Sequence, residues 1–280
     1  RAQEGRHRKE RMSYFAVLNA VAIFFGLAFA LLAWKRLPIL ANRSGAVRLG
    51  VLWVAATTAE YWLLGPYSYL ATYADLDFAP TLYYFLARLT DGAQFTHALA
   101  GGNDIAAMAM NSGQFLSLDQ LLYAAMPMWA AVGLMRIAQT ALALAGAYLF
   151  CRQSLGLSRD MSFASGAVYS LVNEYFFHIT VVHGLGYAFI PMAVHLIVGR
   201  VGRQRYFAGV LLAALIVTTS STPSHSGLTL LATLFLSGIL LGWKRVAASA
   251  AGILILLAAI VLNWAESLYA KAQVAPYSIR

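Results

Sequence analysis

The chain alternates between long apolar runs and short polar segments, and this pattern predicts membrane-spanning α-helices. A bilayer core about 30 Å thick requires roughly 20 apolar residues for one helical crossing. Eight runs approach that length, namely 14–34, 49–64, 128–151, 161–172, 185–198, 207–219, 228–241 and 246–264. The predicted fold class is therefore an all-α integral membrane protein with about eight transmembrane helices.

One polar connector is much longer than the others. Residues 65–127 are acidic and rich in turn-forming residues, and they predict a long loop on one side of the membrane. Within this loop, residues 116–125 have the pattern of a short amphipathic helix lying in the interface, and Pro127 is expected to end it. The predicted organisation is a basic segment (1–13), an extra helix with its following loop (14–48) and a transmembrane module (49–280).

The composition excludes a water-soluble domain, because 60% of the residues are apolar and only 11% are charged. Lys and Arg number 20 against 11 Asp and Glu, a balance that in a soluble chain would suggest a nucleic-acid partner. Here the charges lie between apolar runs and form no basic patch or stripe. We expect no nucleic-acid partner and interpret the basic excess as a sign of membrane topology.

The positions of Lys and Arg predict the orientation, since short cytoplasmic loops collect them. Alternate loops carry a basic set opposed only by Asp160, made up of Lys35, Arg36, Arg43, Arg48, Arg152, Arg159, Arg200, Arg203, Arg205, Lys244 and Arg245. The other loops carry an acidic set, made up of Asp75, Asp77, Asp91, Asp104, Asp119, Glu174 and Glu266, opposed by Arg88, Lys271 and Arg280. The loop 65–127 is therefore expected to be extracytoplasmic.

The two ends of the chain fit this scheme poorly. Five basic residues between Arg1 and Arg11 would lie outside, which three alternatives explain: a true start at Met12, a missing upstream helix, or the opposite orientation. After the last apolar run the chain turns polar and stops, so we expect the natural protein to continue beyond Arg280. The single cysteine, Cys151, excludes an intramolecular disulfide.

Motifs of soluble enzymes are absent from the sequence, and the candidate chemistry lies on the predicted outer side. Asp75 and Asp77 stand just before Pro80, and two carboxylates so close together can act as a base or hold a divalent cation. The alternative is a solvated loop in which Asp77 caps a helix. Asp104 follows a Gly-Gly-Asn turn that places its carboxylate near the membrane surface.

Histidines and two charges within apolar runs complete the candidate residues. His178, His183 and His225 fall on the same side, with interfacial hydrogen bonding as the alternative to a binding role. Glu60 and Arg136 lie within the second and third apolar runs, where a charge is costly. Arg136 can bind a lipid phosphate, and an internal ion pair with Glu60 is an equally good explanation.

The order of these features resembles the GT-C superfamily of membrane glycosyltransferases, most closely its YfhO-like bacterial branch. The resemblance covers 49–280 and rests on Gly65-Pro66-Tyr67, Asp75, Gly101-Gly102-Asn103-Asp104, Asn111-Ser112-Gly113-Gln114, and the segments 142–150 and 155–159. Three features depart from the family. Residues 94–97 replace a Trp often seen before the Gly-Gly turn, the helix at 14–34 is extra, and the large extracytoplasmic domain that often follows the helices is missing.

The resemblance implies a transferase that moves a sugar from a polyprenyl-phosphate carrier to an acceptor at the outer face of a bacterial inner membrane. By position, Asp75 would be the general base, with Asp77 as second choice. Asp104 would hold the acceptor or a metal, and the same three carboxylates are the candidates for a divalent cation. The residues that would contact the phosphate are Arg136, His183 and His225.

A second hypothesis is a non-catalytic membrane subunit packed among partner subunits in a larger complex. Its support is the number of small residues suited to close helix contact, such as Ala141, Ala143, Ala145 and Gly146. A transporter is a third alternative, but no inverted repeat or strongly broken helix favours it.

Overall fold

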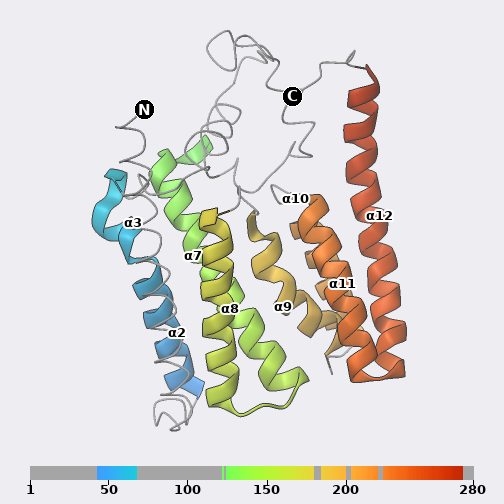
Figure 1. Cartoon of the computed structure of the whole chain (residues 1–280), viewed down its shortest axis with the longest axis horizontal. Helices are drawn as coiled ribbons and strands as arrows, with labels where there is room; N and C mark the ends of the chain where they lie inside the picture. The colour runs from blue at the N-terminus through green and yellow to red at the C-terminus, as the bar shows by residue number, and fades with distance from the viewer. Residues whose placement is uncertain are drawn as a thin grey trace, which may run out of the picture.

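The computed structural model describes residues 43–67, 122, 124–179, 184–199, 203–219 and 223–273, and these residues form helices and no strand. The helices pack side by side as a bundle (Figure 1). In chain order they are α2 (Arg43–Thr57), α3 (Ala59–Leu64), α7 (Met128–Leu149), the π-helical turn η3 (Phe150–Ser154), α8 (Arg159–Ile179), α9 (Gly184–Val198), α10 (Arg203–Thr219), α11 (Pro223–Leu241) and α12 (Trp243–Gln273). The all-α prediction is confirmed for the described residues.

Seven of the eight predicted apolar runs coincide with these helices, and the run 14–34 lies outside the described residues. Most helices extend beyond the apolar run that predicted them. α2 begins at Arg43, in a segment expected to be a loop, and α12 continues through Glu266 to Gln273. The helices are longer than the apolar runs because polar residues at a helix end keep the backbone hydrogen bonds of the helix, although their side chains interrupt the apolar pattern.

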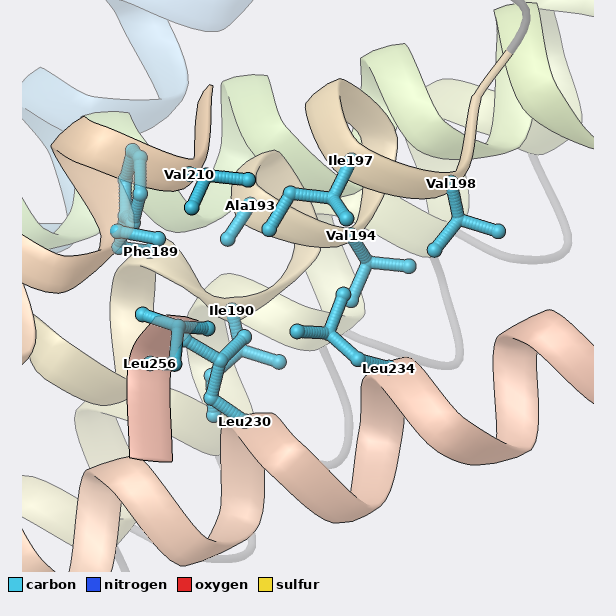
Figure 2. Packing of buried hydrophobic residues seen from close by; sticks show 11 residues of the cluster. Phe189, Ile190, Ala193, Val194, Ile197, Val198, Val210, Leu230, Leu234 and Leu256 are labelled. Atoms are coloured by element: carbon cyan, nitrogen blue, oxygen red, sulfur yellow. The ribbon is translucent and has the colours of Figure 1, made fainter. Parts of the chain in front are cut away.

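α9 is the central helix of the bundle and packs against α7, α10, α11 and α12. It supplies six of the eleven residues of the main core, which are Phe189, Ile190, Ala193, Val194, Ile197 and Val198 (Figure 2). They meet Val210 of α10, Leu230 and Leu234 of α11, and Leu256 of α12. A smaller core joins α2, α7 and α8 through Ala46, Leu144, Phe163 and Ala167.

Pro191 lies inside α9 and cannot donate the backbone hydrogen bond that the carbonyl of Tyr187 would otherwise accept. That carbonyl accepts a hydrogen bond of 2.7 Å from the hydroxyl of Tyr169 on α8. The interruption in α9 is therefore compensated by the neighbouring helix, as apolar surroundings require.

The predicted crossing at 49–64 is two helices, because the chain breaks at Thr58. The hydroxyl of Thr58 donates to the carbonyl of Val54 at 2.7 Å, and that of Thr57 donates to the carbonyl of Trp53 at 2.9 Å. Such back-bonding bends helices. The break turns the short α3 toward α7, whose first residue follows Pro127 as predicted.

One helix among the described residues, Trp129–Ser154, is long and apolar enough to cross a membrane, and less than half of it is buried. Three shorter apolar helices cover 44–57, 186–198 and 227–241. Large apolar side chains also point outward on several helices, including Val51, Leu63, Leu211, Leu240 and Leu254, each more than half exposed.

Candidate functional site

α7 carries three buried polar side chains on one face. Arg136, Gln139 and Thr140 are spaced three and four residues apart, so they lie on adjacent turns, and each is at most 2% exposed. They lie near the middle of α7, and Arg136 is about 12 Å along the helix from Met128. A buried guanidinium in an apolar helix needs compensation.

α3 supplies a carboxylate on the same side. Glu60 is near enough to Arg136 for the two side chains to interact electrostatically. The helices approach closely here because Gly133 faces Tyr61, and a Cβ at Gly133 would lie 3.1 Å from the Cβ of Tyr61. The break at Thr58 and the absence of a side chain at Gly133 together bring Glu60 to the buried cation.

Gln139 is a buried residue of α7 whose polar side-chain atoms are both unsatisfied. Neither its amide nitrogen nor its amide oxygen has a hydrogen-bond partner, although the residue is only 1% exposed. An amide buried in this way costs about 1–3 kcal/mol, which binding of a polar group at this position would recover. Gln139 was not among the predicted site residues, because an uncharged amide in an apolar run does not by itself indicate a site.

Most of the predicted site residues cannot be placed. Asp75, Asp77, Asp104 and His183 lie outside the described residues, and His225 falls in the first turn of α11. Of the predicted site residues, the structure therefore describes only the side chain of Arg136. In the described part of the chain, no group of three or more His, Cys, Asp or Glu side chains is positioned to hold a metal ion.

A shallow, open groove of about 420 Å³ runs along α8. Ala164, Ser165, Val168, Tyr169 and Val172 line it, and the surface they present is mostly apolar. Tyr169 is the same residue whose hydroxyl satisfies the carbonyl of Tyr187. A groove of this size and polarity suits a hydrocarbon chain better than a polar ligand.

The opposite end of α7 has a second polar contact that the sequence analysis did not anticipate. The hydroxyl of Ser154 in η3 is 3.0 Å from Nδ1 of His195, a histidine of α9 that is 5% exposed. The guanidinium of Arg152 donates to the carbonyl of Leu157 in the connection that leads to α8. These bonds fix the α7–α8 connection against α9, and they involve none of the predicted site residues.

No family model, curated protein or solved structure matches the chain.

Proposed function

We propose that the chain is a multi-pass protein of the bacterial inner membrane and acts at the outer face of that membrane as a polyprenyl-phosphate-sugar-dependent glycosyltransferase. The observation that carries the proposal is the buried pair of Arg136 and the unsatisfied Gln139 on one face of α7. Both side chains can donate N–H groups to the same anion, which is the requirement for binding a phosphate.

Multi-pass membrane placement is supported by helix length and by the outward-facing side chains. α7 has 22 residues and α8 has 21, so each is about 32 Å long, close to the thickness of a bilayer core. The exposed side chains of α2, α10, α11 and α12 include many large apolar ones. Exposed apolar surface spread over several helices suits lipid and not water.

On binding, a lipid phosphate would replace the Glu60 carboxylate as the group that compensates the charge of Arg136. In the unliganded protein, Glu60 compensates the charge of Arg136 electrostatically. A lipid phosphate would take the guanidinium as its counter-ion and supply acceptors for the Gln139 amide. Because the surroundings exclude water, these interactions are stronger than at an exposed surface.

The other residues of the proposed mechanism are assigned from the resemblance to GT-C glycosyltransferases. Asp75, or Asp77 in second place, takes a proton from the acceptor hydroxyl, whose oxygen then bonds to the anomeric carbon of the donor sugar. The bond from that carbon to the phosphate oxygen breaks, and the polyprenyl phosphate leaves with the electron pair. Arg136, His183 and His225 stabilise the leaving phosphate, and Asp104 holds the acceptor.

The groove along α8 supports the lipid part of the proposal. A polyprenyl carrier has to reach its site from the bilayer, and its hydrocarbon chain needs an apolar surface on the side of the bundle. The groove lined by Val168 and Val172 offers one.

Part of the support for the alternative of a non-catalytic subunit has another explanation. Gly146 packs inside the chain, where an added Cβ would lie 2.8 Å from the backbone nitrogen of Met192 on α9, and Ala143 is fully buried. Ala145, by contrast, is exposed.

Replacement of Gln139 tests the proposed phosphate site. In Gln139→Leu, an unsatisfied amide becomes an apolar group of similar size, so the unfolding temperature should stay the same or rise. If Gln139 binds phosphate, the KM for the polyprenyl-phosphate sugar should rise about tenfold, because a hydrogen bond to a charged group is lost. Transfer by purified protein and thermal unfolding would both be measured.

Ser249→Ala is the matched control. Ser249 is 1% exposed and its hydroxyl has no hydrogen-bond partner, but it lies on α12 and not on α7. Its removal should leave KM unchanged. Asp75→Asn should reduce transfer by about two to four orders of magnitude with the fold intact. Unchanged KM in Gln139→Leu together with full activity in Asp75→Asn would contradict the proposed function.

A further inference from the structure

The end of the bundle where α2, α8 and α12 begin has a strongly one-sided charge. The start of α2, the α7–α8 connection and the α11–α12 turn all lie at this end (Figure 1). Among the described residues near this end, Asp160 is the one acidic residue against eight basic ones, which are Arg43, Arg48, Arg152, Arg159, Arg203, Arg205, Lys244 and Arg245. Tertiary structure has brought four separate segments that carry basic residues to one end of the bundle.

The α11–α12 turn presents apolar and basic side chains together. Gly242 has a φ of +110°, which lets the chain reverse within one residue between the two helices. On either side of it, Leu240 is 82% exposed and Trp243 is 88% exposed. Lys244 is exposed as well, so an indole, an isobutyl group and an ammonium project from a single turn.

The turn is held firmly in place, so its exposed side chains do not result from a loose loop. The backbone nitrogens of Arg245 and Val246 donate to the carbonyl of Gly242 at 2.9 and 3.0 Å. The hydroxyl of Tyr206 on α10 donates to the carbonyl of Ala248 at 3.0 Å, which ties the start of α12 to a third helix.

We propose that this turn is a binding surface for the headgroups of anionic phospholipids. Trp243 and Leu240 have the chemistry of side chains that sit at the boundary between headgroups and acyl chains. Lys244 and Arg245 provide the charge that attracts anionic lipid, and the other basic residues at this end extend the attraction across the bundle. Charge complementarity and an exposed indole favour a lipid surface over an acidic protein.

This inference requires that the chain lies in a membrane, but it does not depend on the proposed transferase activity. Its residues belong to α11 and α12 and include neither Arg136 nor Gln139 of α7, so a failure of one proposal leaves the other intact.

Trp243 itself provides the measurement. The full chain would be reconstituted into vesicles of phosphatidylglycerol and phosphatidylcholine, with bromine on the acyl chains of one lipid at a time and equal mole fractions. The chain has six Trp residues, so the fluorescence of Trp243 is taken as the difference from Trp243→Phe. Brominated phosphatidylglycerol should quench this fluorescence about two- to fivefold more than brominated phosphatidylcholine at low salt.

Two perturbations separate specific attraction from general contact with lipid. Lys244→Gln and high salt should each reduce the preference for phosphatidylglycerol, while Lys244→Arg should keep it. Lys271→Gln is the matched control, because Lys271 is on the same helix about 40 Å away. Equal quenching by the two lipids, a preference that survives both Lys244→Gln and high salt, or an equal loss in Lys271→Gln would overturn the proposal.

Discussion

Pro191 shows how the loss of one hydrogen-bond donor is compensated within this bundle. Because Pro191 has no N–H, the carbonyl of Tyr187 depends on the Tyr169 hydroxyl from the next helix. The bond also joins α8 to α9, whose direct contacts are few compared with those that each helix makes with α7. Tyr169 therefore provides a hydrogen-bond donor for a backbone carbonyl and also holds α8 against α9.

This leads to a prediction at the scale of single residues. Tyr169→Phe should lower the free energy of unfolding by about 1–3 kcal/mol, since it removes the hydroxyl that donates to the carbonyl of Tyr187. Pro191→Ala restores the N–H within α9, so the double variant should recover most of the lost free energy of unfolding. Thermal unfolding in detergent of both single variants and the double variant measures the coupling between the two residues. If the effects of the two single variants simply add in the double variant, the Tyr169 hydroxyl does not act by compensating for the N–H missing at Pro191.

At the scale of helices, close approach depends on glycines that face backbone. A Cβ at Gly146 would lie 2.8 Å from the backbone nitrogen of Met192, and one at Gly166 would lie 2.7 Å from the carbonyl oxygen of Leu144. Backbone atoms cannot rotate away as a side-chain end can. The contacts of α7 with α9 and with α8 are therefore set by these two positions.

The glycine contacts give the second prediction. Gly146→Ala and Gly166→Ala should each destabilise the protein by about 1–3 kcal/mol, because a helix has to move to admit the methyl group. Gly50→Ala is the control, since its Cβ would meet only side-chain atoms of Leu144 and Phe163, at 3.5 and 3.9 Å. That variant should be neutral or stabilised by about 1 kcal/mol through helix propensity. Unfolding temperatures that fall equally in all three variants would contradict the argument.

At the scale of the whole molecule, the described charges separate toward the two ends of the bundle. The basic set gathers where α2, α8, α10 and α12 begin, whereas Glu266 lies in the last third of α12. This separation motivates the topology prediction, because the basic end is expected to face the cytoplasm.

Cysteine accessibility tests that orientation. In a Cys151→Ala background, cysteines introduced at Ser112 and Ser224 should react with a membrane-impermeant thiol reagent in intact cells. A cysteine at Gln153 should react only after the cells are opened. Gln153 is preferable to its neighbour Ser154, because Gln153 is exposed and Ser154 is bonded to buried His195. The reverse labelling pattern would place the Arg136 site nearer the cytoplasm and remove the basis for extracytoplasmic transfer.

The site was only partly predictable from sequence. Arg136 stood out because a charge in an apolar run is costly wherever the run packs. Gln139 did not stand out, since an uncharged amide becomes notable only when its surroundings are known to lack hydrogen-bond partners. The roles of Asp75, Asp77, Asp104, His183 and His225 stay predictions, because they rest on order along the chain.

The sequence by itself determined where helices lie among the described residues, since an apolar run is a local property of the chain, but it did not determine where those helices end. It did not determine that 49–64 is two helices, because the break depends on hydroxyl groups bonding back to the backbone. Only tertiary structure decided that Glu60 interacts electrostatically with Arg136, that the Tyr169 hydroxyl donates to the carbonyl of Tyr187, and that four segments carrying basic residues lie at one end of the bundle. These features join residues far apart in the chain, and such pairings depend on how helices pack and not on any local pattern.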